Sequence, residues 1–592
     1  MNIKEPSPPT ATRTTWDRVE LDGYRAAHAI ADVLYAAGVR EIYGQSCPTA
    51  IFLAAEKIGI RQIGFRTENA GVAMADGAAR VTRRVAVVTA QNGPAAGLLV
   101  AGLAEALKAS IPIVAIVQEV PHSSADKNAF QEIDHEGIFR GCTKWIRRIN
   151  LSERAAEYTE RAIRTATSGR PGPVVLLVSP DVLSEAVEAA VLPAPDANDP
   201  FGGYPADRYL PARSKVDELA ALLAKAERPL VVAGGGVHHA GAYAALARLQ
   251  NMAGIPVATT NMGKGAIDED HPLALGVIGN AMGTRSPARY FRDYIDSADL
   301  VLFIGSRTNE NGTASWTLFP RSAAYAQIDI DPAELGRNYV GLRLLGDARE
   351  TLDALCDALE GLRTPAMQAR AGRLAAAFAA ARVRHQDEVA PYTSSTASPL
   401  RPERIMAALD ALPGPVTWVA DASYSSIWLV QYLRCREAGR RFIAPRGIAG
   451  LGWGFPMAIG AKVAQPSQTV ICLTGDGGFA HCWAELETAR RHGIAVVVVV
   501  LNNGVLGFQI NAEESRFGTH TKVCHFGPID HVAIARACGC DGVAVTDASQ
   551  LDGALQQALT SGLPFVVDVH TDPTAFPPIT AFESQFAGST AQ

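Results

Sequence analysis

"GDGGFAHCWAELETARRHGIAVVVVVLNN", from Gly475 to Asn503, decides the fold that the sequence predicts. The residues that lead into it, "TVICLTG" (469–475), are β-branched and apolar, which predicts a buried strand. The apolar residues of Phe479 to Arg491 recur near helical spacing, and Gly493 is a typical helix stop. "IAVVVVVL" (494–501) is rich in Val and too short to span a membrane, so it predicts a second strand buried on both faces. A strand, a helix and a strand in this order form a right-handed crossover with parallel strands.

Two polar side chains follow the predicted strands, at the point where each strand ends. Asp476 and Asn503 therefore lie on the same rim of the sheet, where open α/β sheets bind ligands. A carboxylate and an amide oxygen are hard ligands suited to Mg²⁺ or Ca²⁺. The glycines of the stretch leave backbone N–H groups free at a helix start, which suits a phosphate. The alternative is a turn aspartate and a strand-end asparagine that bind no ligand.

Length and composition limit the classes of protein to consider. At 592 residues the chain should hold about three or four domains. Its residues are 48% hydrophobic and 19% charged, which fits large, well-buried α/β cores. The formal net charge of −6 argues against a nucleic-acid partner. Nine scattered cysteines in so long a chain do not form a disulfide framework, so we expect a reducing compartment.

The first residues and the hydropathy pattern bear on location. The stretch "MNIKEPSPPTATRTT" is rich in Pro and Thr and has no apolar core, so residues 1–19 are predicted to be a disordered leader and not a signal peptide. No apolar stretch approaches the length that spans a membrane. We therefore expect a soluble, cytoplasmic protein.

Two polar, proline-rich stretches divide the chain, Leu192 to Pro211 and Ala390 to Pro402. In each of the three blocks that they separate, apolar strand-like runs such as "RRVAVVTA", "ADLVLFIGS" and "PFVVDVH" alternate with helical patterns. The predicted class is α/β, with three consecutive doubly wound parallel-sheet domains over residues 20–190, 212–365 and 400–575.

Several motifs, taken in order, resemble one family. GDG followed by NN resembles the thiamine-diphosphate signature, and "RTENAGVAMADGAAR" (66–80), "AFQEIDHEGIFRGCTKW" (129–145) and "GLGWGFPMAIGAK" (450–462) accompany it. Together they resemble the acetolactate-synthase-like (acetohydroxyacid synthase) superfamily over nearly the whole chain. The resemblance implies that the three domains are a pyrimidine-binding domain, a central Rossmann-like domain and a diphosphate-binding domain.

The resemblance also implies how a cofactor is held. Asp476, Asn503 and the backbone carbonyl of Val505 would hold Mg²⁺, which bridges the diphosphate of thiamine diphosphate. Leu451 falls where an apolar wedge forces the cofactor into its bent conformation. The other implied contacts to thiamine diphosphate are Tyr424, Ser425, Gly477, Gly478, Leu506 and Gly507.

Two residues are implied to be catalytic, Glu68 and Gln131. The bent cofactor brings its own amino group to the thiazolium carbon, a very weak acid, so that proximity makes this group the base. A glutamate that shares its proton with the pyrimidine ring favours the tautomer that takes the proton, and burial would raise its pKa as this role requires. Glu68 falls at that position, and Gln131, in "FQE", reaches the reacting centre. A solvated helix-start residue is the alternative for Glu68, and we interpret His122, His135 and His481 as ordinary core or surface residues.

Three departures from the family pattern lie where substrate would bind. "SRTNENGTASW" (306–316) stands where acetolactate synthases show an "RFDDR"-like stretch, and Ala512 stands where they place a substrate-selecting tryptophan. "YGQSCPTA" (43–50) replaces a glycine-rich stretch. We predict a thiamine-diphosphate- and Mg-dependent enzyme that makes or breaks a C–C bond next to a carbonyl, a 2-oxo acid decarboxylase or carboligase. The alternatives are a lyase or hydrolase of a diketone or 2-hydroxyacyl-CoA, and a non-catalytic homologue, against which the intact Glu68, Asp476 and Asn503 speak.

The resemblance bears on a second cofactor and on assembly. The central-domain segments match flavin-contacting segments of some relatives, whereas other relatives bind ADP or nothing there. We expect FAD, contacted by Gly235, Gly236, Thr260, Gly305, Arg307, Asp329, Ile330 and Asp347. In relatives the first domain of one subunit faces the third domain of another. We therefore expect a homodimer, or a homotetramer made as a dimer of dimers, with active sites at the subunit interface.

Overall fold

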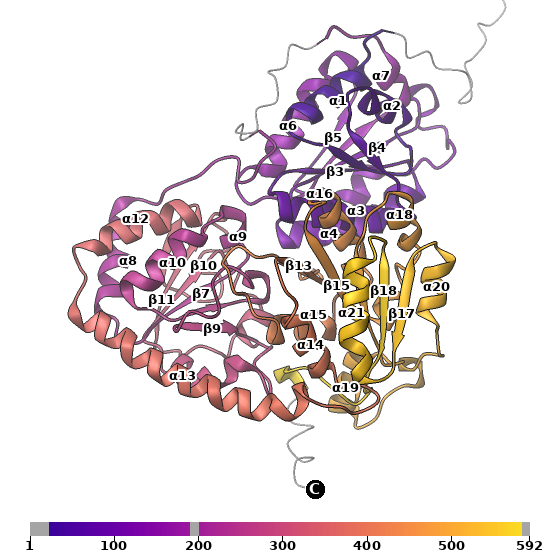
Figure 1. Ribbon diagram of the computed structural model, residues 1–592. Coiled ribbons are helices and arrows are strands. Elements are labelled where there is room, and N and C mark those ends of the chain that lie inside the picture. The colour runs from indigo at the N-terminus through magenta and orange to yellow at the C-terminus, as the bar shows by residue number, and fades with distance from the viewer. Residues whose placement is uncertain (1–22, 190–200, 583–592) are drawn as a thin grey trace, which may run out of the picture.

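The computed structural model describes residues 23–189 and 201–582 (Figure 1). The predicted leader at residues 1–19 and the first part of the 192–211 linker lie outside the described residues. The described chain forms three six-stranded sheets, and every paired strand in them is parallel. The predicted class, three consecutive α/β parallel-sheet domains, is confirmed.

The first domain has the strand order β2-β1-β3-β4-β6-β5. Its strands are β1 (Glu41–Tyr43), β2 (Arg61–Ile63), β3 (Ala86–Ala90), β4 (Ile113–Gln118), β5 (Trp145–Ile149) and β6 (Val174–Val178). Its helices are α1 (Ala26–Ala36), α2 (Thr49–Lys57), α3 (Glu68–Thr82), α4 (Pro94–Ala109), α5 (His135–Phe139), α6 (Ala155–Thr167) and α7 (Pro180–Ser184).

The central domain has the order β12-β11-β10-β7-β8-β9, which is the strand order of a Rossmann sheet. Its strands are β7 (Pro229–Ala233), β8 (Val257–Thr259), β9 (Ala274–Val277), β10 (Leu300–Ile304), β11 (Ala324–Asp329) and β12 (Leu342–Leu345). Its helices are α8 (Arg213–Lys225), α9 (Gly236–Ala240), α10 (Tyr243–Ala253), α11 (Arg292–Ile295), α12 (Ala348–Glu360) and α13 (Pro365–Thr393).

The third domain has the order β14-β13-β15-β16-β18-β17, which repeats the order of the first domain. Its strands are β13 (Val416–Ala420), β14 (Phe442–Ile443), β15 (Thr469–Gly475), β16 (Val497–Asn502), β17 (Asp541–Val545) and β18 (Phe565–His570). Its helices are α14 (Pro402–Asp410), α15 (Tyr424–Tyr432), α16 (Gly454–Ala464), α17 (Asp476–Phe479), α18 (Glu485–Arg491), α19 (Gly507–Phe517), α20 (His531–Ala537) and α21 (Leu551–Thr560).

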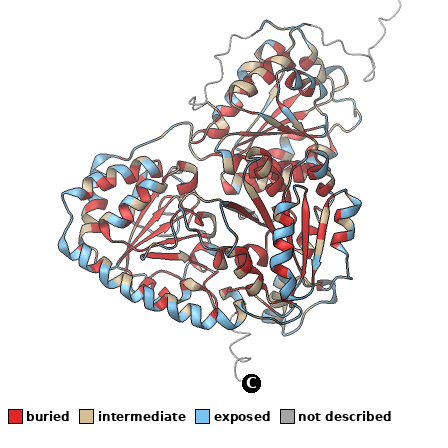
Figure 2. Cartoon of the chain, in the orientation of Figure 1, coloured by how far each residue is buried: buried red, intermediate tan, exposed pale blue. Residues whose placement is uncertain are grey.

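The central strands of each sheet are buried on both faces because they are apolar at nearly every position. Val498 of β16 packs into the core that the third domain shares with the first, while the next residue, Val499, packs into a core on the other face. Val87 and Val88 of β3 divide between two cores in the same way. Figure 2 shows these strands as buried and the outer helices as exposed on one side only. The continuous Val-rich runs therefore mark sheets covered by helices on both faces.

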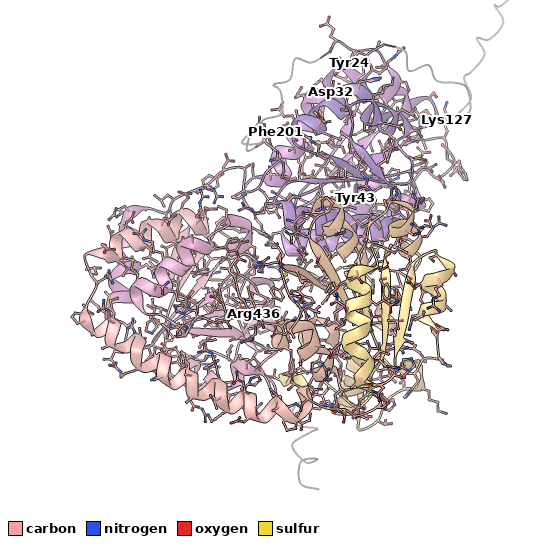
Figure 3. All side chains as sticks on the ribbon, viewed as in Figure 1. Tyr24, Asp32, Tyr43, Lys127, Phe201 and Arg436 are labelled. Atoms are coloured by element: carbon pink, nitrogen blue, oxygen red, sulfur yellow. The ribbon has the colours of Figure 1, made fainter. Side chains whose placement is uncertain are left out.

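The first and third domains are joined along α3 and α16, which lie in contact between the two sheets (Figure 1). A Cβ atom on Gly460 would lie 1.8 Å from the carbonyl oxygen of Met74, and one on Gly77 would lie 2.1 Å from the carbonyl oxygen of Met457. Only glycine permits so close an approach of two helices. Tyr43, at the end of β1, lies on the side of the first domain that faces the third and belongs to the same shared core (Figure 3).

Two local predictions were wrong. The segment Phe479 to Arg491 is not one helix: α17 ends at Phe479, a tight turn follows, and α18 begins at Glu485. The apolar spacing did not reveal the break, because the turn keeps Phe479, Cys482 and Leu486 buried. The second predicted linker begins inside a helix, since α13 continues through Pro391 to Thr393.

Within the described residues, no helix combines the length and apolar character needed to cross a membrane. The nine cysteines of the chain are all free thiols.

Candidate active site

A cavity of about 910 Å³ opens at the carboxyl rim of the third sheet and extends to the central domain. β15 ends at Gly475 and β16 at Asn502, and the two strands pair in parallel, so Asp476 and Asn503 lie on the same rim as predicted. All ten residues predicted to contact thiamine diphosphate line this cavity: Tyr424, Ser425, Leu451, Asp476, Gly477, Gly478, Asn503, Val505, Leu506 and Gly507. The rim therefore gathers residues that lie far apart in the chain into one site.

The three predicted metal ligands lie together on this rim. The Asp476 carboxylate accepts a hydrogen bond from the backbone N–H of Gly504 at 2.9 Å, which ties the two loops together. The Asn503 side-chain oxygen accepts one from the N–H of Val505 at 3.2 Å. Burial raises the pKa of Asp476 above its usual value, as expected for a carboxylate with no ion-pair partner in the described part of the chain. A carboxylate, an amide oxygen and a backbone carbonyl are oxygen donors of the kind that Mg²⁺ takes.

Leu451 lines the cavity, and backbone hydrogen bonds to Asp421 hold the loop that carries it. The Asp421 carboxylate accepts backbone hydrogen bonds from Gly452 (2.9 Å), Trp453 (3.1 Å) and Gly454 (3.0 Å). Gly452 has a φ of +80°, a backbone conformation that favours glycine. Asp421 was not among the predicted site residues, although its place after the strand "VTWVA" carried the same signal as Asp476.

Glu68 lies at the first residue of α3, away from this cavity. Its side chain is largely buried, and burial raises its pKa. The backbone N–H groups of Arg66 and Thr67, just before it, donate to the buried carboxylate of Glu485 in the third domain at 3.1–3.2 Å. None of the described residues that line the 910 Å³ cavity, called the thiamine cavity after the contacts predicted for it, comes from the first domain. A separate hollow beside the start of α3 is lined by Gln45 and by other residues that include Gly44, Ser46, Phe65 and Arg66.

Gln131 also lies outside the cavity of its own chain. It adopts a φ of +64°, and its side-chain oxygen accepts a hydrogen bond from Gln91 at 3.2 Å. Its neighbour Phe130 is 84% exposed, an unusual position for a large aromatic side chain. The pair therefore lies on an open surface of the first domain.

None of the three histidines His122, His135 and His481 lines the thiamine cavity. His135 is buried and accepts the N–H of Gly93 at 3.0 Å, and His122 pairs with Asp181 at 3.0 Å. His481 is exposed and does not line the thiamine cavity.

A second, narrower cavity of about 110 Å³ lies at the carboxyl rim of the central sheet. The residues predicted to contact FAD all line it: Gly235, Gly236, Thr260, Gly305, Arg307, Asp329, Ile330 and Asp347. Burial raises the pKa of Asp329 to about 7. Asp347 begins α12 as its N-cap and also pairs with Arg208 at 2.8 Å, so this carboxylate already has partners.

Part of the thiamine cavity is lined by residues that sequence reasoning did not select. Glu310, Asn311, Ala314 and Ser315, from the segment that departs from the family pattern, reach the cavity from the central domain. Ala314, Ser315 and Trp316 adopt positive φ in succession, a strained backbone for residues other than glycine. Ala512 packs against the core instead, and Phe508 and Gln509 of the same helix α19 line the cavity.

Comparison with known protein families gives three matches in sequence order. Residues 24–138 match "Thiamine pyrophosphate enzyme, N-terminal TPP binding domain". Residues 216–355 match the central domain of the same enzymes, and residues 421–569 match their C-terminal TPP binding domain. Each matched range falls within one of the three domains described above.

Comparison with individual proteins gives matches along most of the chain. The "Probable acetolactate synthase large subunit" of Methanocaldococcus jannaschii is 32% identical over 560 residues, 93% of this chain and 92% of that protein. "Acetolactate synthase isozyme 2 large subunit" of Escherichia coli K12 is 29% identical, covering 92% of this chain and 95% of its own length. "Acetolactate synthase 2, chloroplastic" of Nicotiana tabacum is 31% identical, covering 86% and 76%.

Proposed function

Because the chain belongs to the thiamine-pyrophosphate-dependent enzymes that resemble the acetolactate synthase large subunits, we propose that it is a Mg-dependent decarboxylase or carboligase of a 2-oxo acid. The observation that carries this proposal is the cavity in which Asp476, Asn503 and Val505 meet the other predicted cofactor contacts. The names of the relatives favour a 2-oxo acid over a diketone or an acyl-CoA. The free thiols of the chain support the proposal of a reducing, cytoplasmic compartment.

Different residues of the site would contact the two ends of the cofactor. When bound, thiamine diphosphate would supply a nucleophilic carbon that adds to a carbonyl and a cationic thiazolium ring that takes up the electron pair of the broken bond. Asp476, Asn503 and the Val505 carbonyl would hold Mg²⁺ at the diphosphate end. Leu451, fixed by Asp421 through its loop, would support the bent shape of the cofactor. Glu68 would hold the proton that is shared with the pyrimidine ring.

A substrate panel with the purified enzyme, thiamine diphosphate and Mg²⁺ tests the proposed reaction. We expect CO₂ release from pyruvate or a longer 2-oxo acid, with or without an added aldehyde or second 2-oxo acid as acceptor. Turnover only of diketones or acyl-CoA thioesters, with no release of CO₂ from any 2-oxo acid, would contradict the proposal. Residues of the segment 306–316, which differs from the family pattern, line the cavity. We therefore expect this segment to govern the choice of acceptor.

We further propose that each active site is shared between two subunits. Met74 meets Gly460 and Gly77 meets Met457, so α3 and α16 run antiparallel. Arg80, near the end of α3, donates to the carbonyl of Ala444, in the stretch that leads to Leu451. Glu68 is twelve residues from Arg80, about 18 Å along a helix, and therefore lies at the opposite end of the pair. A two-fold dimer would bring the partner's Glu68 to this chain's Leu451.

Mixing two inactive variants tests the shared site. Glu68→Gln and Asp476→Ala should each be inactive alone, because each lacks one half of the site. In a mixed dimer, one of the two sites would combine the intact Glu68 of one chain with the intact Asp476 of the other. After subunit exchange at equal concentrations, we expect about a quarter of the wild-type activity to return, since half of the dimers are mixed and each has one complete site. No recovery, with exchange proven by differently tagged chains, would show that the site lies within one chain.

We also propose that the central cavity binds FAD. Its lining combines Gly235, Gly236 and Gly305, where a backbone can approach a ligand closely, with the cation of Arg307 and the buried carboxylate of Asp329. The purified protein should be yellow, or should become so after incubation with FAD and gel filtration. Arg307→Ala is expected to weaken flavin binding and to leave the affinity for thiamine diphosphate unchanged, because the two cavities are lined by different residues. If the protein were colourless and calorimetry showed that it binds ADP but not FAD, the central cavity would be an ADP site and the FAD proposal would be wrong.

A further inference from the structure

The thiamine cavity contains an arginine that the sequence reasoning and the family comparison leave unassigned. Arg446 follows the edge strand β14 after two residues and lines the same cavity as Asp476 and Leu451. One terminal nitrogen of its guanidinium donates a hydrogen bond to the Ser426 hydroxyl. Its Nε atom is buried and has no hydrogen-bond partner in the described part of the chain. A guanidinium therefore lies in the cavity with unused donors.

No carboxylate of the described residues forms an ion pair with Arg446. The carboxylate whose charge acts on Arg446 is that of Glu105 of α4, and it offsets only part of the lowering of the Arg446 pKa by burial. The Glu105 oxygens, however, accept backbone hydrogen bonds from Gly447 (2.6 Å), Ile448 (2.6 Å) and Ala449 (3.1 Å). Glu105 also lies 3.8 Å from Arg80, a second cation. The Glu105 carboxylate therefore already has partners in the backbone of residues 447–449 and in Arg80.

Arg446 is a partly buried cation without a paired anion, which costs free energy, and a bound anionic ligand can offset that cost. Burial lowers the pKa of Arg446 to about 10, which still leaves the guanidinium protonated at neutral pH. Its planar set of donors matches a phosphate or a carboxylate with two parallel hydrogen bonds. The cavity is thus prepared for a negatively charged group at this point.

We propose that Arg446 forms an anion-binding subsite of the thiamine cavity, which takes a phosphate of thiamine diphosphate or the carboxylate of the 2-oxo acid. This rests on the proposed function, and the position of Ser426 favours the phosphate. Ser426 lies in the first turn of α15, directly after the predicted diphosphate contacts Tyr424 and Ser425. The free backbone N–H groups at the start of that nine-residue helix add to the positive potential around Arg446.

Calorimetry with Arg446→Met separates the two sources of the anion. If Arg446 binds a phosphate, the Kd of thiamine diphosphate should rise about 10- to 100-fold, as for loss of a hydrogen bond to a charged group. The Kd of unphosphorylated thiamine should then stay unchanged. If Arg446 binds the substrate, the affinity for thiamine diphosphate should be unchanged and the KM of the 2-oxo acid should rise by a similar factor. The KM of an uncharged aldehyde acceptor should not change.

Two further variants complete the test. Arg440→Met removes a partly exposed arginine from the same stretch of chain, paired with Glu437 at 2.5 Å and absent from the lining of the cavity, and should change neither affinity nor KM. Arg446→Lys keeps the charge without the paired donors, so it should lie between wild type and Arg446→Met, and it serves where the methionine variant fails to fold. Wild-type affinity and wild-type KM in a folded Arg446 variant would overturn the subsite. A wild-type enzyme that does not bind thiamine diphosphate would instead overturn the proposed function.

Discussion

Replacing Asp476 by alanine is expected to abolish retention of thiamine diphosphate while leaving the protein folded. The change removes the only carboxylate among the three predicted metal ligands, so the charges of the diphosphate would meet the rim without a bridging Mg²⁺. Removing one partner of a buried charge pair costs about 2–5 kcal/mol, which corresponds to an affinity about 30- to 5,000-fold weaker. Calorimetric titration with thiamine diphosphate, in the presence and absence of Mg²⁺, measures the effect.

Asp476→Asn is the matched control for the structural role of this residue. Asparagine keeps an oxygen that can accept the Gly504 N–H, so the link between the two loops should survive. It loses the negative charge that we propose holds the metal, so its affinity for thiamine diphosphate should fall as well. Thermal unfolding should show that the asparagine variant keeps the stability of wild type. If the asparagine variant bound the cofactor as tightly as wild type, the Asp476 carboxylate would only stabilise the loop through its hydrogen bond with Gly504 and would not be a metal ligand.

The sequence was sufficient for the central strands of the sheets because these strands are nearly continuous apolar runs. "TVICLTG" becomes β15 residue for residue, and the ends of β15 and β16 place Asp476 and Asn503 on one rim. Parallel pairing follows from the crossover rule and needs no knowledge of distant contacts. The break between α17 and α18 could not be predicted, because a tight turn and a helix bury apolar residues at similar spacing. The continuation of α13 through Pro391 was hidden by the proline-rich composition of its end.

The far wall of the thiamine cavity could not be predicted, because its residues carry no local motif. Glu310 and Asn311 come from the central domain and approach the rim only through domain packing. Arg446 stands in a loop whose only sequence signal is a charge between small and apolar residues. Asp421 could have been found, since it ends a buried strand as Asp476 does. Motifs therefore predicted the proposed cofactor end of the cavity, while its proposed substrate end depends on tertiary structure.

The second large effect is expected for Glu68→Gln, which should slow proton exchange at the reactive carbon of bound thiamine diphosphate about 10²- to 10⁴-fold, the range for losing one positioned acid–base group. Glutamine keeps the size of the side chain but cannot pass a proton to and from the pyrimidine ring. Burial already raises the pKa of Glu68, which favours the protonated form that this role requires. Glu68 lies on the first domain, and the proposed Mg²⁺ and diphosphate contacts lie on the third, so cofactor affinity should change little.

Acid-quenched deuterium exchange in the two proteins decides between catalysis and structure, because it reports the proton step without depending on the substrate. Turnover should fall in parallel, unless product release limits the rate. The fixed backbone around Glu68 strengthens the test: the N–H groups of Arg66 and Thr67 are held by Glu485, so exchanging one side-chain oxygen for an amide should not move α3. If Glu68 only supported the helix start, exchange would stay at the wild-type rate and stability would shift by about 0.5 kcal/mol or less, as is usual for changes away from buried networks. Exchange at the wild-type rate in a folded, cofactor-loaded variant would therefore remove Glu68 from the proton step and leave this enzyme's activation to another residue.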